Sequence, residues 1–346
     1  MNNLIVLNKN DNVGVSQFII PEKTKIEGHE ISTIDPIPFG HKVCLKPIKK
    51  GDPIIKYDQI IGFASKNISA GEHVHTHNLE SKEFERAFKV NNKKTIVDEN
   101  ADTFFNGILR ENGQVATRNY IGIVSTVNCS ATVTKMIVEK IKYSNILNDY
   151  PNIDGIVPIT HSTGCGMNTV SEGMQMFQRT IDGFKNHPNF SHVFVIGLGC
   201  ECAQVSLFDE SVKKHNRIHF LTIQDEGGTK KIVEKVLSQI KNLLSEANDI
   251  KRTPESVSHL TLALQCGGSD GYSGITANPA LGVAADMLVK KGGSSILSET
   301  PEIYGAEHLL INRANSQETA DKLMKRLEWW KHYTCLLYTS DAADES

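Results

Sequence analysis

The sequence lacks the features that mark several large classes of protein. Its 37 Lys and Arg residues do not outnumber its 40 Asp and Glu residues, and the net charge of -3 predicts no basic surface for nucleic acid. No apolar run approaches the roughly 20 residues that a membrane-spanning helix needs. The opening MNNLIVLNKNDN has no charged stretch followed by an apolar core, so we expect no signal peptide. These absences favour a cytoplasmic protein without a nucleic-acid or membrane partner.

The common nucleotide-binding fingerprints are missing as well. The sequence has neither a G-x-G-x-x-G motif nor a glycine-rich loop that ends in Gly-Lys-Ser or Gly-Lys-Thr. A nucleotide-dependent oxidoreductase is therefore a disfavoured reading. Seven cysteines in a leaderless chain of 346 residues predict reduced thiols rather than a disulfide framework.

The length gives room for two or three domains, and the patterns along the chain divide it. Residues 1–80 carry short apolar runs separated by glycines, which predicts a small β-rich domain. Residues 81–106 are polar without a hydrophobic period and are expected to be a linker. Over 107–333 strand-length runs alternate with helical stretches, which predicts an α/β domain with a mostly parallel sheet. The expected strands are 121–126, 155–159, 193–197, 219–223, 260–264 and 295–297, and the expected helices are 131–143, 170–183, 229–247, 279–291 and 317–331.

The last residues continue no pattern. After Tyr333 we expect the final helix to end, and residues 334–346 then offer no partner element. We interpret them as a non-native tail and the α/β domain as incomplete at its C-terminal side.

Cysteines follow four of the predicted strands. In a parallel sheet, ligands bind outside the carboxyl ends of the strands. A single cysteine is ordinarily a small core hydrophobe, but its recurrence at strand ends favours a thiolate pocket for iron or another soft-tolerant metal. His161 and Glu201 lie in the same loops and are candidate catalytic residues. The candidate thiolate ligands are Cys129, Cys165, Cys200 and Cys266.

The densest motif is CGGSDGYSGITANP, residues 266–279. Its glycines let backbone N–H groups approach a ligand closely. Asn278 followed by Pro279 predicts a helix N-cap and first helical residue, and a helix N-terminus favours an anion such as a carboxylate. A structural glycine turn is the alternative. The candidate substrate-binding side chains of this motif are Ser269, Asp270, Ser273 and Asn278.

Two further groups complete the candidates. If residues 73–77 form a strand, alternation places His73, His75 and His77 on one face. Neutral imidazoles there would suit a divalent metal or proton transfer near pH 7, whereas a solvated edge strand is the alternative. Arg118 and Asn119 precede the first strand of the large domain, and Arg118 would clamp a carboxylate unless it is an ordinary surface arginine.

Taken together, long motifs carry a family resemblance. They are AGEHVHTHN (70–78), TRNYIGI (117–123), VNCSA (127–131), GLGCE (197–201), QCGGSDGYSGITANPALG (265–282) and SETPEIYGAEHLL (298–310). In this order they resemble the altronate/galactarate dehydratase family from about residue 4 to about residue 333. The histidine-rich stretch resembles the altronate branch more than the galactarate branch.

The resemblance implies a SAF-like β-clip domain followed by an α/β catalytic region. It implies a hydro-lyase that removes water from an altronate-like aldonate or an aldarate and forms a 2-keto-3-deoxy acid. A divalent metal is implied, Fe²⁺ first and Mn²⁺ second, with a small sugar acid as the binding partner; a homo-oligomer stays open. A sulfolactate-type sulfo-lyase of the same family and a non-catalytic sugar-acid binding protein are the alternatives. Family members continue beyond the end of this chain, so a catalytic residue from that part is expected to be missing.

The chemistry defines the roles to be filled. A general base takes the C2 proton, a general acid protonates the departing 3-hydroxyl, and a metal stabilises the enediolate charge. The candidates for acid and base are His75, His77, His161 and Glu201. The candidate metal ligands, taken as alternatives, are His73, His75, His77 and the four strand-end cysteines.

Overall fold

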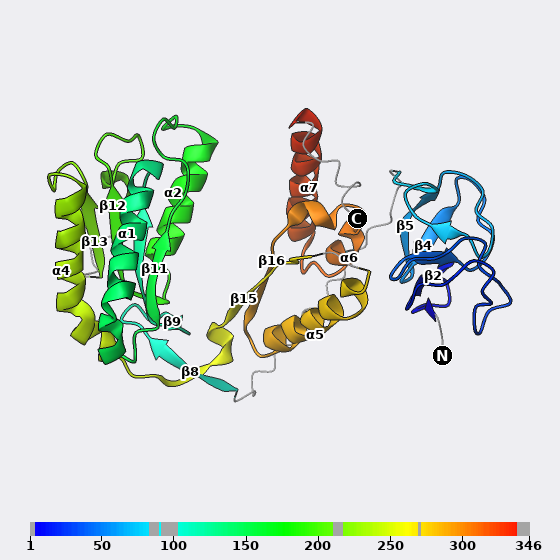
Figure 1. The fold of residues 1–346 in the computed structure, drawn as a ribbon, viewed down its shortest axis with the longest axis horizontal. Helices are drawn as coiled ribbons and strands as arrows, with labels where there is room; N and C mark the ends of the chain where they lie inside the picture. The colour runs from blue at the N-terminus through cyan, green and yellow to red at the C-terminus, as the bar shows by residue number, and fades with distance from the viewer. Residues whose placement is uncertain (1–3, 83–89, 91–102, 210–216, 269–270, 338–346) are drawn as a thin grey trace. The chain divides into compact units, whose positions relative to one another are not determined.

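The structure is a computed structural model that describes residues 4–82, 90, 103–209, 217–268 and 271–337 (Figure 1). The chain forms two compact units. Unit 1 combines residues 1–99 with residues 260–346, and unit 2 comprises residues 100–259. None of the described helices is both long and apolar enough to cross a membrane.

The N-terminal part of unit 1 is β-rich, as predicted. An antiparallel four-stranded sheet has the order β1-β2-β3-β6, and a three-stranded sheet has the order β4-β5-β7. Buried apolar side chains such as Val13, Ile54 and Ile68 form a core beneath the strands. The strands are β1 (Leu4–Ile5), β2 (Val13–Ser16), β3 (Lys42–Cys44), β4 (Pro53–Lys56), β5 (Gln59–Ala64), β6 (His73–Val74) and β7 (Leu79–Glu80).

The C-terminal part of unit 1 has its own small sheet. Strands β15 (Thr261–Leu264) and β16 (Ser294–Leu297) pair in parallel and are joined through α5 (Ala277–Lys290). The prediction that both strands extend the large parallel sheet is therefore wrong, because among the described strands they pair only with each other. Helices α6 (Glu307–Ile311) and α7 (Gln317–Leu337) follow. Helix α7 runs past the expected end at Tyr333, and residues 338–346 lie outside the described residues.

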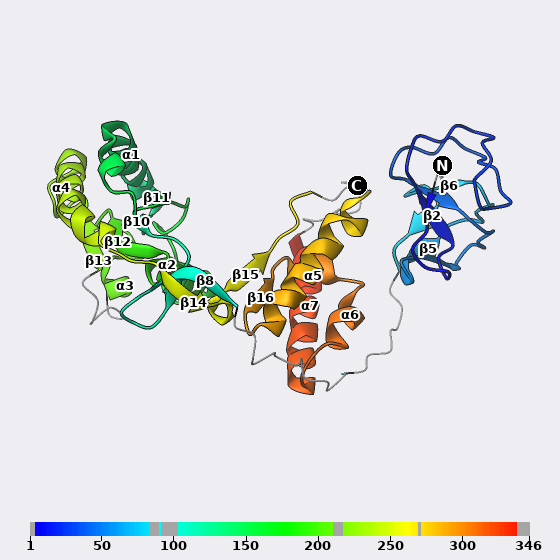
Figure 2. The same ribbon diagram turned by 90° about the horizontal axis from the view of Figure 1, so that it is seen from below.

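Unit 2 is built on a four-stranded parallel sheet with the order β11-β10-β12-β13. Helices α1 and α4 cover one face, and α2 with the short α3 covers the other (Figure 2). A sheet buried on both faces needs strands that are mostly apolar, and all eight residues of β12 are buried, with Ser191 and His192 as its polar members. The elements are β10 (Tyr120–Ser125), α1 (Asn128–Ser144), β11 (Gly155–Ile159), α2 (Glu172–Lys185), β12 (Phe190–Gly197), α3 (Ser206–Asp209), β13 (Ile218–Thr222) and α4 (Thr229–Asn248).

The strand order creates a topological switch point. From β10 the chain passes to β11 on one side and later to β12 on the other side. Loops that leave the carboxyl ends of β10 and β12 therefore diverge to opposite faces, which is where doubly wound sheets bind ligands. An antiparallel sheet of β14 (Thr253–Ser256), β8 (Phe104–Leu109) and β9 (Val115–Ala116) lies in the same unit. Strand β8 begins inside the stretch 81–106 that we expected to be a linker, most of which lies outside the described residues.

Candidate functional site

Three strand-end loops of unit 2 are joined by backbone hydrogen bonds at the switch point. The Asn128 N–H, at the start of α1, donates to the Thr163 carbonyl of the β11 loop at 2.9 Å. In the β12 loop, the Cys202 N–H donates to the Cys165 carbonyl at 3.2 Å, and the Ala203 N–H donates to the Gly164 carbonyl at 3.4 Å. The loops after β10, β11 and β12 therefore form one connected surface.

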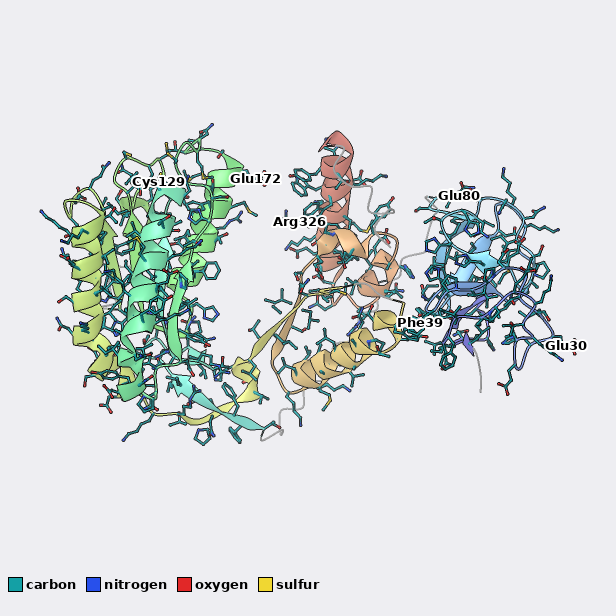
Figure 3. All side chains as sticks on the ribbon, in the orientation of Figure 1. Glu30, Phe39, Glu80, Cys129, Glu172 and Arg326 are labelled. Atoms are coloured by element: carbon teal, nitrogen blue, oxygen red, sulfur yellow. The ribbon has the colours of Figure 1, made fainter. Side chains whose placement is uncertain are left out.

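Each of these loops presents a cysteine. Cys129, Cys165 and Cys200 are exposed free thiols. Cys129 lies in the first turn of α1, at the same end of unit 2 as Glu172 in the first turn of α2 (Figure 3). Desolvation, and then the neighbouring Cys165 and Cys200, raise the pKa of Cys129. The structure thus brings together three of the four predicted thiols. Cys266 belongs to unit 1.

Glu201 is a buried carboxylate whose hydrogen bonds connect the end of β10 to the β12 loop. It is 2% exposed, and its Oε1 accepts hydrogen bonds from the Thr126 hydroxyl at 2.9 Å and the Leu198 N–H at 3.0 Å. Its Oε2 accepts from the Gly199 N–H at 2.6 Å. These contacts tie the β12 loop to the end of β10 and give Glu201 a positioning role. Its assignment as a catalytic acid or base stays a prediction.

His161 likewise has partners on both ring nitrogens. Its Nε2 lies 2.9 Å from the Ser125 carbonyl, and its Nδ1 lies 3.3 Å from the Thr163 N–H. A carbonyl accepts and an N–H donates, so these partners favour the tautomer that carries its proton on Nε2. The ring also meets Phe177 edge-on at 4.7 Å between centroids. Proton transfer by His161 would break one of these bonds and stays a prediction.

The second candidate cluster lies in the N-terminal part of unit 1. The prediction that 73–77 is a strand is wrong beyond Val74, because β6 ends there and a turn follows. The imidazoles nevertheless gather: ring centroids of His73 lie 5.6 Å from His75 and 5.4 Å from His77. Asn78 holds the turn by donating to the His73 carbonyl and accepting from the His75 N–H, each at 2.9 Å.

A fourth histidine belongs to this cluster, and sequence reasoning missed it. His41 Nδ1 lies 2.9 Å from His73 Nε2, and the rings of His41 and His75 stack at 4.9 Å. It enters the cluster because β3 pairs with β6, with Val43 opposite His73. No local pattern singled it out, because its place in the cluster depends on the pairing of strands thirty residues apart. We call His41, His73, His75 and His77 the histidine cluster.

The environment of the histidine cluster favours the neutral form of His41, His73 and His75 at pH 7. Burial, reinforced by the neighbouring histidines and Lys42, lowers the pKa of His73 to about 4. Burial and Lys42 also lower the pKa of His41 and of His75. Neutral imidazoles accept protons and can donate a lone pair to a metal, so the cluster suits either predicted role.

The same pKa shifts predict acid sensitivity of unit 1. Below pH 6.5 the histidines of the unfolded chain become protonated, whereas His73 in the folded protein stays unprotonated until about pH 4. The unfolded state is therefore favoured as the pH falls from 6.5 towards 4, and stability present at neutral pH is lost. We expect the melting temperature of the wild-type protein to fall more between pH 7.5 and pH 5 than that of His73→Asn. His29→Asn, outside the cluster, should retain the wild-type fall. Equal falls in wild type and His73→Asn, measured by circular dichroism, would contradict the assignment.

The glycine-rich motif 266–279 contacts the loop before His41. A Cβ added at Gly271 would lie 2.8 Å from the Gly40 carbonyl, so only glycine permits this approach. Tyr272 donates its hydroxyl hydrogen to the Ser16 carbonyl at 2.8 Å. The motif therefore lies beside the histidine cluster within unit 1. The loop is closed by Glu299, whose Oε2 accepts from the Cys266 N–H at 2.9 Å.

The structure places the predicted substrate side chains of this motif differently. Helix α5 begins at Ala277 after Thr276, so Asn278 is exposed in the first turn and is not the N-cap. The N-cap prediction is wrong because a short 3-10 turn, Ser273–Ile275, carries the chain directly into the helix. Ser273 is half-buried in that turn. Ser269 and Asp270 lie outside the described residues.

Arg118 and Asn119 lie at the amino ends of the unit 2 strands, opposite to the end that carries the thiols. They precede β10, whereas the thiols follow the strands. Asn119 is fully buried and donates from Nδ2 to the Asn152 and Ala247 carbonyls at 2.8 and 2.9 Å. Exposed Arg118 forms an ion pair with Asp154 at 3.4 Å. The structure does not bring these two residues to the thiols, and their hydrogen bonds indicate a role in the fold.

A single metal ion is not accommodated by the side chains as they stand. Among the residues that the structure describes, no three His, Cys, Asp or Glu side chains are arranged to hold one ion. The thiols and the histidine cluster are nevertheless the two groups of soft-tolerant donors in the described parts of the chain.

The structure combines a β-rich N-terminal module with a doubly wound α/β unit that carries thiols at its switch point. Comparisons with known proteins identify the family to which this combination of domains belongs. Residues 2–82 match the family model described as the altronate/galactarate dehydratase SAF domain. Residues 107–248 match the second domain of D-galactarate dehydratase/altronate hydrolase, and residues 257–342 match the C-terminal D-galactarate/altronate dehydratase model. The last match reaches into the stretch 334–346 that we interpreted as non-native.

Curated relatives extend this similarity over most of the chain. It is 33% identical over 96% of its length to altronate dehydratase of Bacillus subtilis strain 168, and 32% identical over 93% to altronate dehydratase of Escherichia coli K12. It is 34% identical over 91% to galactarate dehydratase (L-threo-forming) of the same E. coli strain. The chain belongs to the altronate/galactarate dehydratase family. It spans 67%, 65% and 62% of the lengths of these three relatives.

Proposed function

We propose that the chain is part of a hydro-lyase that removes water from altronate or a close aldonate and forms a 2-keto-3-deoxy acid. The observation that carries the proposal is similarity along 96% of the chain to a relative named altronate dehydratase. Two altronate dehydratases and one galactarate dehydratase among the relatives support a sugar acid as substrate. Reduced thiols support a cytoplasmic location, which we include in the proposal.

The groups of unit 1 match the acid–base part of this reaction. Abstraction of a proton next to a carboxylate needs a base that is unprotonated near pH 7. His75 and His77 of the histidine cluster are our candidates for base and acid, since burial lowers the pKa of His75 and leaves its ring neutral. The adjacent glycine-rich motif, with Ser273 and Asn278, is our candidate for holding the polar groups of the sugar acid.

Iron is part of the proposal. When bound, iron supplies a Lewis acid for the negative charge that develops on the carboxylate and the 2-hydroxyl. Thiolate sulfur favours iron over harder ions such as Mg²⁺, which supports Cys129, Cys165 and Cys200 as its ligands. The described side chains are not arranged to hold an ion as they stand, so binding requires the thiol-bearing loops to move. Mn²⁺ is the alternative cofactor.

An anaerobic assay with ferrous iron tests the proposal. Altronate, galactarate and sulfolactate are offered separately to this chain and to a version completed with the C-terminal third of the B. subtilis relative. We expect the completed protein to form 2-keto-3-deoxy acid from altronate at least tenfold faster than from galactarate. Sulfite release from sulfolactate would reassign the reaction to a sulfo-lyase. A folded, iron-loaded completed protein that binds altronate without turnover would instead favour a binding protein.

A further inference from the structure

Unit 2 contains a cavity at the end opposite to the thiols. Its volume is about 380 Å³, which falls within the range of small-molecule sites. Its walls come from the turn between β8 and β9, the amino ends of β12 and β13, and the C-terminal end of α4. Figures 1 and 3 show β8 and β9 at the opposite end of unit 2 from Cys129. The charged and titratable residues of the lining are Arg110, Glu111, His192, Arg217 and Glu246.

Two arginines line this cavity with neutral oxygens as their acceptors. Arg110 donates from Nε to the Pro188 carbonyl at 2.8 Å and from Nη2 to the Asn119 Oδ1 at 3.1 Å. Arg217 donates from Nη1 to the Phe190 carbonyl at 2.8 Å. Among the described residues, neither guanidinium forms an ion pair with a carboxylate. A guanidinium has five N–H donors, so each arginine keeps donors that these bonds do not use.

The positive charges of the cavity oppose one another. Burial, and then the neighbouring charges of Arg217 and Arg252, lower the pKa of Arg110 to about 10. Burial also lowers the pKa of Arg217. Both side chains are still charged at pH 7, so the cavity holds two partly desolvated cations that repel each other. An anion bound between them would offset this repulsion.

His192 adds a buried ring with an unused nitrogen. The residue is 8% exposed, and its Nδ1 is enclosed without a hydrogen-bond partner among the described residues. A buried polar atom without a partner is uncommon and indicates a place for a ligand, an ion or water. Burial, and then the charges of His219, Arg110 and Arg217, lower the pKa of His192 to about 4. A bound anion would counteract the two arginines and raise that pKa.

Two carboxylates also line the cavity, but they do not neutralise it. Glu111 and Glu246 are both exposed. Burial lowers the pKa of His219, and the charge of Glu246 partly opposes that effect. Neither carboxylate is among the charges that shift the pKa of Arg110. The arginines therefore set the sign of the cavity.

We propose that this cavity binds the oxyanion head group, phosphate or carboxylate, of a small metabolite. Arg110 and Arg217 supply the positive charge and the N–H donors, and the planar guanidinium matches the oxygens of either head group. His192 supplies a further polar contact. The groups that we assign to the sugar acid lie in unit 1, and the thiols lie at the other end of unit 2. The ligand of this cavity is therefore a second small molecule, and its binding does not depend on the proposed dehydration.

Calorimetric titration of the full chain tests the site. The probes are inorganic phosphate and malonate, each at an ionic strength held constant with sodium chloride. We expect at least one of them to bind once per chain with a Kd below about 1 mM. Tighter binding of phosphate would identify a phosphorylated ligand, and tighter binding of malonate a carboxylated one. Arg217→Gln should weaken binding at least about tenfold, because it removes charge-assisted hydrogen bonds.

Matched variants separate the cavity from general surface charge. Arg179→Gln removes an exposed arginine of α2 in the same unit and should keep the wild-type affinity. Glu246→Gln removes a negative charge from the lining and should keep the affinity or tighten it. Equal weakening by Arg217→Gln and Arg179→Gln would overturn the proposal, as would the absence of saturable binding of both probes.

A measurement on the wild-type protein avoids the risk that Arg217→Gln fails to fold. Nuclear magnetic resonance follows the titration of His192, whose signal is assigned by its loss in His192→Asn. Saturating amounts of the anion that binds should raise the pKa of His192 by at least about one unit, because a nearby negative charge favours the protonated ring. A His192 pKa that the bound anion leaves unchanged would place the anion elsewhere and overturn the proposal.

Discussion

Replacing Gly164 with alanine is expected to destabilise unit 2 by about 3 kcal/mol or more. Gly164 is buried in the β11 loop with a φ of +101°, a conformation that side chains rarely adopt. A Cβ at this position would collide with the Thr126 carbonyl oxygen and would lie 3.0 Å from the Cα of Val127. Both neighbours are backbone atoms at the end of β10, so neither can rotate away.

The measurement is chemical denaturation followed by circular dichroism, with Gly166→Ala as the matched control. Gly166 lies two residues away in the same loop, and nothing lies within 4 Å of an added Cβ. We expect the control to change the free energy of unfolding by less than about 1 kcal/mol. Because the thiol-bearing loops meet at Gly164, the alanine variant should also bind less iron. Equal stability of the two variants would show that the loops do not pack as described.

Substitution of Glu201 has the second large expected effect. In Glu201→Gln one oxygen can still accept from Thr126 and Leu198, but the amide nitrogen then faces the Gly199 N–H. Two donors without an acceptor in a site that is 2% exposed should cost about 2 kcal/mol. Glu201→Ala, which leaves three donors without their acceptor, should cost more.

Asp225→Asn provides the control for charge removal. Asp225 is exposed in the loop after β13, so its substitution should change the free energy of unfolding by less than about 0.5 kcal/mol. If Glu201 acts by connecting the loops, Glu201→Gln should lower both the free energy of unfolding and the iron content. A variant that keeps wild-type stability and iron but loses turnover would instead make Glu201 a catalytic residue.

Local patterns predicted the elements that carry the site. The strand expected at 155–159 is β11 as observed, and the helix expected at 229–247 is α4 to within one residue. Apolar runs, helical periodicity and glycine turns are properties of a few consecutive residues, so they can be read along the chain. The placing of Cys129, Cys165 and Cys200 at neighbouring strand ends followed from the parallel topology alone.

Features that depend on pairing between distant segments were not predictable in this way. His41 joined the histidine cluster through the pairing of β3 with β6. Glu201 accepts a hydrogen bond from Thr126 because the β12 loop lies against the end of β10. β15 and β16 formed a separate sheet although their sequences resemble those of the other strands.

The sequence by itself determined the family, the β-rich N-terminal module, the alternation of strands and helices, and the presence of thiols after the strands. Only the tertiary structure decided which side chains meet. It places three thiols at one switch point and four histidines in the other unit, and it pairs Arg118 with Asp154 at the opposite end of the strands. The physical reason is that periodicity encodes which face of an element is buried. The partner of that face is selected by packing and hydrogen bonding across the whole fold.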